Sequence, residues 1–230
     1  MGSVDTKMTC VLITYADAKY QPRQQQLAAK AATNGMGSIS YTREQIEQTA
    51  FYQDHRHILD QPRGNGYWLW KPYIILDAMN QVNNDDVIFY QDCGDDFDPD
   101  TVKSVKLDLG QPCLLVNSNM HPHTWWCKRD CFYYMDCDND NYYHTYQTEA
   151  GANFWANNDN SRNIAATWLQ YCTDVRLISD DANTCGLDNL PEFIDHRHDQ
   201  AILHNLSIKY QLPVDREIWQ RFDWNNYKVN

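Results

Sequence analysis

The sequence predicts a single α/β domain in which helices flank a mainly parallel central sheet. Short apolar runs rich in β-branched and aromatic residues, such as Thr9–Tyr15 and Val87–Tyr90, are typical of buried strands. Helical stretches alternate with them, as at Gln24–Thr33 and Ser161–Cys172. Such alternation favours parallel strands joined by right-handed crossovers. The 230 residues contain no repeat or linker, so we expect one domain with a sizeable core.

Local signals place the remaining elements. Ser38–Tyr41 alternates like a strand, and Thr42 with Gln45 resembles a capping box at the start of a helix. Pro72 suits the first turn of a helix that we expect to run from Tyr73 to about Val82. Further along, the sequence predicts helices at 101–107, at 128–135 and from 195 onward, strands at 112–117 and 150–155, an edge strand at 175–178, and irregular segments at 136–142 and 213–230.

The charge balance restricts the partners that the chain is expected to bind. Its formal net charge of −12 argues against nucleic acid and against anionic membrane surfaces, both of which attract clustered Lys and Arg. No run of about 18 apolar residues occurs, so no membrane span is expected. The polar start, Met1–Lys7, lacks the apolar core of a signal peptide. These features predict a cytoplasmic protein whose eight cysteines are reduced thiols.

One cluster of histidines and cysteines raises the question of a zinc site. It comprises His121, His123, Cys127, Cys131 and Cys137. A structural zinc site needs ligand pairs at short spacing, and no Cys-x-x-Cys pair occurs in the chain. We therefore favour ordinary buried cysteines over zinc ligands.

The carboxylates that follow the strand Val87–Tyr90 form the first candidate site. Asp92, Asp95 and Asp96 surround Gly94 within the stretch 85–96. In open α/β sheets, ligands bind at the carboxyl ends of strands, and clustered carboxylates repel one another unless a cation lies among them. Oxygen ligands of this kind suit Mg²⁺ or Mn²⁺ shared with a phosphate group. The alternative is a solvated acidic turn in which Asp and Gly are turn formers.

Two cations near an expected helix start form the second candidate site. Lys71 directly precedes Pro72, and Arg63 lies on the flexible loop that leads to it. Unpaired amides and the helix dipole favour an anion at such a helix start, so a phosphate there would meet both cations. The alternative is that the neighbouring tryptophans, Trp68 and Trp70, are core anchors and Lys71 is a solvated surface charge.

The third candidate site is the run of titratable groups from Asp195 to Gln200. Residues three and four apart share a helix face, so Asp199 and its histidine neighbours are expected to lie close together. An Asp beside a His serves as a base or as a metal ligand. The alternative is a helix-capping Asp with an ion pair to Arg197.

Together these segments resemble a known family. The sequence reads GYWLWKP at 66–72, DVIFYQDCG at 86–94, AG at 150–151 and FIDHRHDQAI at 193–202. Their order and wording resemble the small glycosyltransferases of GT-A fold found in bacteria and large algal viruses, in particular the glycosyltransferase domain of chlorella viruses. The resemblance covers roughly residues 9–210 and leaves out the tail, 211–230. It implies a nucleotide-binding half at about 9–100 and an acceptor-binding, closing half at about 101–210.

The resemblance also implies roles for single residues. Asp92 matches the first carboxylate of the Asp-x-Asp metal signature, but Gly94 stands at its third position, so Asp95 or Asp96 would supply the second ligand. His198 and Asp199 match the element that closes the active site, with Asp199 nearest the reacting centre. With Arg63 and Lys71 from the helix-start argument above, the residues expected to bind nucleotide and donor are Thr14, Tyr15, Arg63, Trp70, Lys71, Asp92, Ala150 and Gly151.

The function that follows is transfer of a sugar from a UDP- or GDP-type donor to a hydroxyl of a glycan or protein-linked glycan, assisted by Mn²⁺ or Mg²⁺. If the chain is viral, the expected compartment is the host cytoplasm. Two alternatives come from other classes. A nucleotidyltransferase or phosphatase also uses Asp-bound Mg²⁺, although residues 15–17 are not the Gly-rich phosphate loop of a nucleotidyltransferase. A non-catalytic sugar-binding module also uses aromatics and carboxylates.

Overall fold

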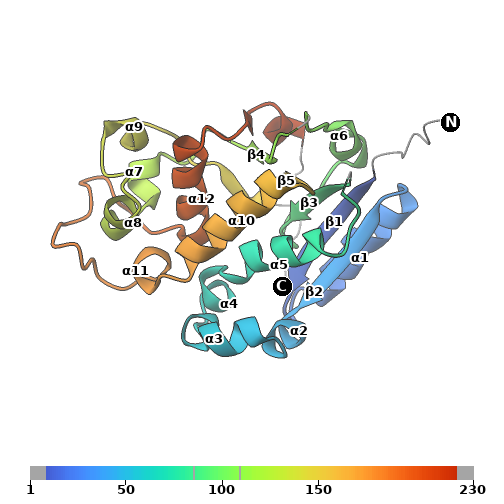
Figure 1. Cartoon of the computed structure of the whole chain (residues 1–230), viewed down its shortest axis with the longest axis horizontal. Coiled ribbons are helices and arrows are strands. Elements are labelled where there is room, and N and C mark those ends of the chain that lie inside the picture. Colours follow the sequence, from blue (N-terminus) through green and yellow to red (C-terminus); the bar gives the residue numbers. More distant parts are fainter. Residues whose placement is uncertain (1–8, 85, 109, 222–230) are drawn as a thin grey trace.

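The computed structural model describes residues 9–84, 86–108 and 110–221, and these fold around one mixed sheet (Figure 1). Predictions that concern residues 1–8, 85 and 222–230 lie outside the described residues. The strand order is β2-β1-β3-β5-β4-β6. Parallel pairing joins β1 to β2 and β3, and β4 to β6, whereas β5 runs antiparallel to β3 and β4. The strands are β1 (Cys10–Ala16), β2 (Gly37–Thr42), β3 (Val87–Gln91), β4 (Cys113–Val116), β5 (Glu149–Ala156) and β6 (Val214–Asp215).

Helices cover both faces of the sheet because the central strands are apolar on both sides. Ile13 and Ile88 face a core shared with α5, α10 and α12, and α10 packs against both other helices (Figure 1). Leu12 and Phe89 face the opposite core, shared with α1 and α6. The helices are α1 (Gln21–Thr33), α2 (Arg43–Glu47), α3 (Ala50–Leu59), α4 (Gly64–Tyr67), α5 (Trp70–Met79), α6 (Pro99–Ser104), α7 (His123–Trp126), α8 (Arg129–Tyr134), α9 (Asp140–Tyr143), α10 (Asp159–Cys172), α11 (Val175–Ile178), α12 (His198–Lys209) and a 3₁₀ turn η1 (Ile218–Arg221).

The α/β architecture and the central position of β3 confirm the predictions from the sequence. The capping box is also confirmed, because Thr42 accepts a hydrogen bond from the Gln45 N–H and the Gln45 side chain accepts one from the Thr42 N–H. Among the described residues, no helix is both long and apolar enough to span a bilayer.

Three of these predictions about short segments were wrong. The segment from residue 213 is not irregular throughout, because Val214–Asp215 pair with β4 as the strand β6 and Ile218–Arg221 form the turn η1. Residues 175–178 form the helix α11, not an edge strand, because the Asp174 carboxylate caps the N–H of Arg176. A four-residue apolar run is compatible with either structure, so its periodicity could not decide. Residues 140–143 form the helix α9, not an irregular segment, because Asn139 accepts a hydrogen bond from the Asn141 N–H.

The expected helix from residue 195 begins only at His198. The preceding residues are held by another segment, because the N–H groups of Ile194 and Arg197 donate to the carbonyls of Trp125 and Trp126 at 2.8 and 3.0 Å. At the other end of the site, α5 begins at Trp70, three residues earlier than expected. This earlier start places residue 71 inside the first helical turn.

The segment 64–68, which links α3 to α5, is a left-handed turn. Its φ angles are all positive, from 53° at Asn65 to 97° at Gly66. The Trp68 N–H donates to the Gly64 carbonyl at 3.3 Å, and the Trp70 indole donates to the same carbonyl at 2.9 Å. Left-handed backbone costs about 1–2 kcal/mol per non-glycine residue, so surrounding contacts must hold the turn.

The close approach of this turn to α3 gives a stability prediction. A Cβ at Gly66 would lie 2.5 Å from the Cα of Leu59, whereas a Cβ at Gly35, which also has positive φ, meets nothing within 4 Å. We expect Gly35→Ala to cost about 1–2 kcal/mol for its backbone conformation. Gly66→Ala should cost roughly 1–3 kcal/mol more, because backbone must move. Urea unfolding of both variants measures the difference, and equal midpoints would contradict this account of the turn.

Candidate functional site

Two adjoining hollows lie at the carboxyl ends of β1 and β3, where the sequence predicts the site. The first hollow has a volume of about 450 Å³ and the second a volume of about 280 Å³. They share Trp68 and Asp92 as a common wall. The first is lined by residues Tyr15, Ala16, Asp17, Lys19, Tyr20, Pro62, Gly64, Asn65, Trp68, Trp70, Asp92, Cys93, Gly94 and Asp95, and the second by Arg63, Trp68, Lys71, Asp92, Trp126, Ala150, Gly151, Asp195, His196, Arg197, His198, Asp199 and Gln200.

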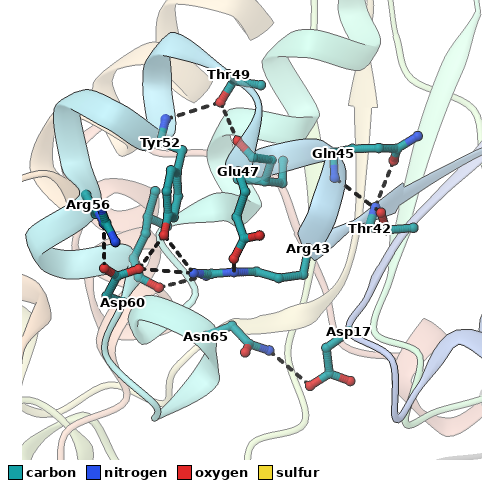
Figure 2. Close-up of polar contacts among 12 residues, drawn as sticks. Asp17, Thr42, Arg43, Gln45, Glu47, Thr49, Tyr52, Arg56, Asp60 and Asn65 are labelled. Atoms are coloured by element: carbon teal, nitrogen blue, oxygen red, sulfur yellow. Dashed lines mark hydrogen bonds and ion pairs between the residues drawn. The ribbon is translucent and has the colours of Figure 1, made fainter.

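One wall of the first hollow is aromatic. The rings of Tyr15 and Trp70 stack with centroids 3.8 Å apart at an angle of 21°. Polar groups also line this hollow. Among them, the Asn65 amide donates to the Asp17 carboxylate at 3.3 Å (Figure 2). A flat ring face beside polar groups suits a ligand with a planar heterocycle or a sugar.

The loop that carries Asn65 is anchored at its start by the guanidinium of Arg43 (Figure 2). Arg43 donates to the Leu59 carbonyl at 2.7 Å and to Glu47 at 2.8 Å, and forms an ion pair with Asp60 at 3.3 Å. The Asp60 carboxylate also accepts from Tyr52. This network fixes the end of α3, and the loop leaves α3 toward the first hollow.

Asp92 and Asp95 converge on one point. The Asp92 N–H donates to the Gly151 carbonyl at 2.8 Å, which places the loop after β3 against β5. A Cβ on Gly151 would lie 3.1 Å from Asp92 Oδ2 and 3.8 Å from Asp95 Oδ2. Asp96 does not join them, because it pairs with Lys30 at 2.7 Å and with Arg23 at 3.2 Å on α1. Glycine at 151 therefore leaves open the space that both carboxylates face.

A bulge in β5 turns backbone carbonyls toward the site. Leu115 on β4 pairs with Asn153, but the next residue, Val116, pairs with Glu149, so residues 150–152 are inserted between neighbouring partners. The Ala150 carbonyl accepts from the Lys71 ammonium at 3.1 Å. The inserted residues thus connect the sheet to the buried ammonium of Lys71.

Lys71 is the centre of these charges. Its Nζ lies 3.4 Å from Asp92 Oδ1 and 3.3 Å from Asp199 Oδ2, and its side chain is only 2% exposed. The alternative in which Lys71 is a solvated surface charge is therefore wrong, because the earlier start of α5 turns Lys71 inward. Burial lowers the pKa of Lys71, but the two carboxylates raise it more, so the ammonium stays charged.

Asp199 is held in place from several sides. Its side chain is 4% exposed and its carbonyl accepts from the Trp168 indole at 3.0 Å. Burial raises the pKa of Asp199 to about 6, although Lys71 opposes the shift. The preceding residue, His198, has a φ of +43°, and its Nδ1 contacts the Ile178 carbonyl at 2.6 Å. A carboxyl with such a pKa takes up and releases protons near neutral pH.

Of the other expected site residues, Arg63 lines one of the two hollows and Thr14 lines neither. Arg63 lines the second hollow but pairs with Asp195 at 2.5 Å and with Asp180 at 3.0 Å. Thr14 is buried in β1, where its carbonyl accepts from Gln24 at 3.2 Å.

Several residues that line the two hollows were not predicted from the sequence. Asp17 lies just beyond β1, as Asp92 lies just beyond β3, so the same positional rule could have found it. The contact between Arg197 and Trp126 had no local signal, because the two residues are 71 positions apart in the sequence. In the structure, the Arg197 guanidinium lies 4.5 Å from the centre of the Trp126 ring. Gln200, named only as part of its run, contacts the site through the Ala150 N–H, which donates to it at 3.1 Å.

The alternative zinc cluster is not assembled. Cys127, Cys131 and Cys137 are buried, and His123 contacts Asn205 at 2.9 Å. Over the described ranges 9–84, 86–108 and 110–221, no group of three His, Cys, Asp or Glu side chains is arranged to hold a metal. The expected burial of these three cysteines is confirmed.

The buried position of Lys71 gives a prediction with a defined pH dependence. In Lys71→Met, two carboxylates lose their cation, which typically costs about 3–5 kcal/mol. With the cation gone, the pKa of Asp199 rises further above about 6. The loss of stability relative to the unmodified chain is therefore smallest at pH 5, grows as pH rises from about 6 toward that higher pKa, and is constant above it. Urea unfolding at pH 5 and pH 8 measures it.

Lys103→Met is the matched control, because Lys103 pairs with Asp100 at 3.2 Å and is 40% exposed. It should lose less than about 1 kcal/mol at either pH. A Lys71→Met variant that behaves like this control would show that the buried charges are not coupled.

No model of a known protein family matches the sequence, and no curated protein matches it. A glycosyltransferase involved in glycosylation of the major capsid of PBCV-1 aligns with 10% identity and a TM-score of 0.42, over 82% of this chain and 81% of that chain. Mouse xyloside xylosyltransferase 1 aligns with 10% identity and a TM-score of 0.47, over 91% and 84%. The bifunctional WbbM glycosyltransferase aligns with 9% identity and a TM-score of 0.49, over 94% of this chain and 40% of that chain. Glycosyltransferases are thus among the solved structures to which this chain is similar, as the sequence motifs led us to expect.

Proposed function

We propose that this chain is a glycosyltransferase that moves a sugar from a nucleoside-diphosphate donor to a hydroxyl of a glycan or protein-linked glycan. The observation that carries the proposal is the pair of hollows that meet at Asp92. One has an aromatic wall and carboxylates, and the other contains the buried pair of Lys71 and Asp199. A donor that spans both would place its nucleotide in the first and its sugar in the second.

The first hollow supports nucleotide binding by its size and its chemistry. Its volume of about 450 Å³ is within the range of roughly 300–1,000 Å³ that is usual for small-molecule sites. The aromatic residues that line it offer apolar surface, and Asp17 and Asn65 offer hydrogen-bonding groups. A UDP- or GDP-type donor fits these features, with Arg63 and Lys71 on the side of the second hollow.

Asp92 and Asp95 fit a divalent cation. Their Oδ2 atoms face the same open space beside Gly151, and carboxylate oxygens suit Mn²⁺ or Mg²⁺. Two carboxylates alone would leave most coordination positions to diphosphate oxygens and water, as is usual for Mg²⁺. Asp96, the alternative second ligand, is engaged by Lys30 and Arg23. Because the Oδ2 atoms of Asp92 and Asp95 face the same space, we propose these two residues as the ligands.

The charges of the site fit the transfer reaction. When the bond between the sugar and the diphosphate breaks, its electron pair goes to the leaving oxygen, and a bound divalent cation would stabilise that negative charge. The chain's own residues then have three tasks. Asp92 and Asp95 hold the diphosphate end, Lys71 keeps Asp92 and Asp199 at fixed positions, and the open backbone at Gly151 lets the sugar lie close to β5.

Asp199 is the group that we propose nearest to the reacting carbon, with His198 beside it. If transfer inverts the anomeric carbon, the Asp199 carboxylate accepts the proton of the attacking hydroxyl. If transfer retains it, the same side chain orients the sugar. Its raised pKa, about 6, suits a group that accepts a proton near neutral pH.

Replacing Asp92 tests the metal assignment. Calorimetric titration of Asp92→Asn with UDP or GDP should give an affinity that Mn²⁺ no longer changes. The control is Asp100→Asn, because Asp100 lies in the same acidic segment but is 91% exposed and outside both hollows. That variant should keep the metal effect of the unmodified chain. A metal effect that persists in Asp92→Asn would refute the assignment.

Replacing Asp199 tests the chemistry. Asp199→Asn keeps the shape and removes the basicity, so donor binding should persist while turnover falls by about 10²-fold or more. In the unmodified chain, turnover should rise with pH through about 6 as the Asp199 carboxyl ionises, and the variant should lack this rise. Release of nucleoside diphosphate from a panel of nucleotide sugars is the measurement. Near-normal turnover would leave Asp199 with a purely structural role.

A further inference from the structure

A third hollow adjoins the second and is not used by the donor site described above. Its volume is about 330 Å³, and it shares Arg63, Asp195 and His196 with the second hollow. The three hollows therefore form a series, with the second in the middle. The third is lined by Arg63, Lys128, Asp180, Asp181, Ala182, Asn183, Asn189, Phe193, Asp195 and His196.

The rim of this third hollow belongs to the loop between α11 and α12, which is held in place from below. Lys128 is only 2% exposed, and its ammonium donates to the carbonyls of Ser179 and Asp181 at 3.3 and 2.7 Å. The Asp130 carboxylate accepts from the N–H groups of Thr184 and Cys185 at 2.8 to 2.9 Å. A loop fixed in this way forms a site without further ordering when a ligand binds.

The groups on this rim suit hydroxyls. Asp180 and Asp181 offer carboxylate oxygens, which accept strongly from hydroxyl donors. The Asn183 side-chain amide donates to the side-chain oxygen of Asn189 at 2.9 Å, which fixes the orientation of both side chains. Phe193 adds one apolar face. A saccharide has hydroxyl groups around an apolar ring face, so it matches the carboxylates and the phenyl ring of this rim.

The balance of charge favours an uncharged ligand. Three carboxylates, from Asp180, Asp181 and Asp195, face two cations, Arg63 and Lys128. The Lys128 ammonium is already directed to two backbone carbonyls, and Arg63 is paired with Asp180 and Asp195. An anion placed here would meet net negative charge and engaged cations.

We propose that the third hollow is the acceptor subsite and that it binds an uncharged saccharide. This proposal rests on the proposed function and names the class of acceptor. The sugar unit would occupy the hollow with its hydroxyls on Asp180 and Asp181 and one face on Phe193. The neighbouring hydroxyl would reach past the Arg63–Asp195 pair, which separates the two hollows, toward Asp199.

Direct binding of sugar probes tests the proposal without requiring turnover. Saturation-transfer NMR, with Mg²⁺ and nucleoside diphosphate present, would compare methyl glycosides of glucose, galactose, mannose and xylose. Methyl glucuronoside is the charged counterpart of methyl glucoside. We expect saturable binding of at least one neutral glycoside. We also expect the glucuronoside to bind at least about 10-fold more weakly than methyl glucoside, or not at all, because a lost charge-assisted hydrogen bond or a like-charge contact has about this size.

Variants connect the binding to this hollow. Asp181→Asn keeps the size of an exposed side chain, and Phe193→Leu removes the flat ring but keeps the apolar volume. Each should weaken the neutral glycoside by about 5- to 10-fold, the equivalent of about one such contact. Asp188→Asn is the matched control, since Asp188 is exposed on the same loop but does not line the hollow. It should bind like the unmodified chain.

The outcomes separate this proposal from the proposed function. Failure of all neutral glycosides to bind, equal binding of the glucuronoside, or unchanged binding in both variants would overturn the acceptor subsite. Failure of the glycosyltransferase proposal has a different signature, in which the unmodified chain neither binds nor hydrolyses any nucleotide sugar. Intact donor binding and hydrolysis in Asp181→Asn and Phe193→Leu would confine their effect to the acceptor.

Discussion

The site depends on the ion pairs that the buried ammonium of Lys71 forms with two carboxylates. The ammonium lies between Asp92 and Asp199, and these belong to a loop after the central strand and to the first turn of α12. Removing such a set of charges from water is costly unless each has a partner at close range. One cation with two carboxylates leaves net negative charge at this centre. A single contact thus links the two hollows electrostatically.

Two segments with unusual backbone bring these groups together. Tyr67 in the left-handed turn has a φ of +54°, and His198 at the start of α12 has a φ of +43°. Their rings stack with centroids 4.9 Å apart, so each strained segment supports the other. Strained conformations persist only where surrounding contacts over-determine them, and they cluster at functional sites. Residue 66 in the left-handed turn must be glycine, because it lies too close to the α3 backbone to carry a side chain.

The sequence predicted the elements of the fold better than the contacts between them. β3 and the carboxylates after it have a clear local pattern, so their central place and their position at the strand end followed from it. The burial of Lys71 depends on where α5 begins, and Trp70 and Pro72 are compatible with either start. The bulge at residues 150–152 depends on the register of β4 against β5, which no local pattern specifies. The same reason hid Arg197 and Trp126, whose contact joins distant parts of the chain.

The two ion-pair systems of the site differ in their contact with solvent. Lys71 and Asp199 are almost fully enclosed, so dissolved salt screens them little. Arg63 and its partners Asp180 and Asp195 are 38–44% exposed. Mobile ions reach them, so the attachment of the left-handed turn to the loop before α12 weakens as ionic strength rises. The centre of the site is therefore insulated from the ionic composition of its surroundings, while the boundary between the second and third hollows responds to it.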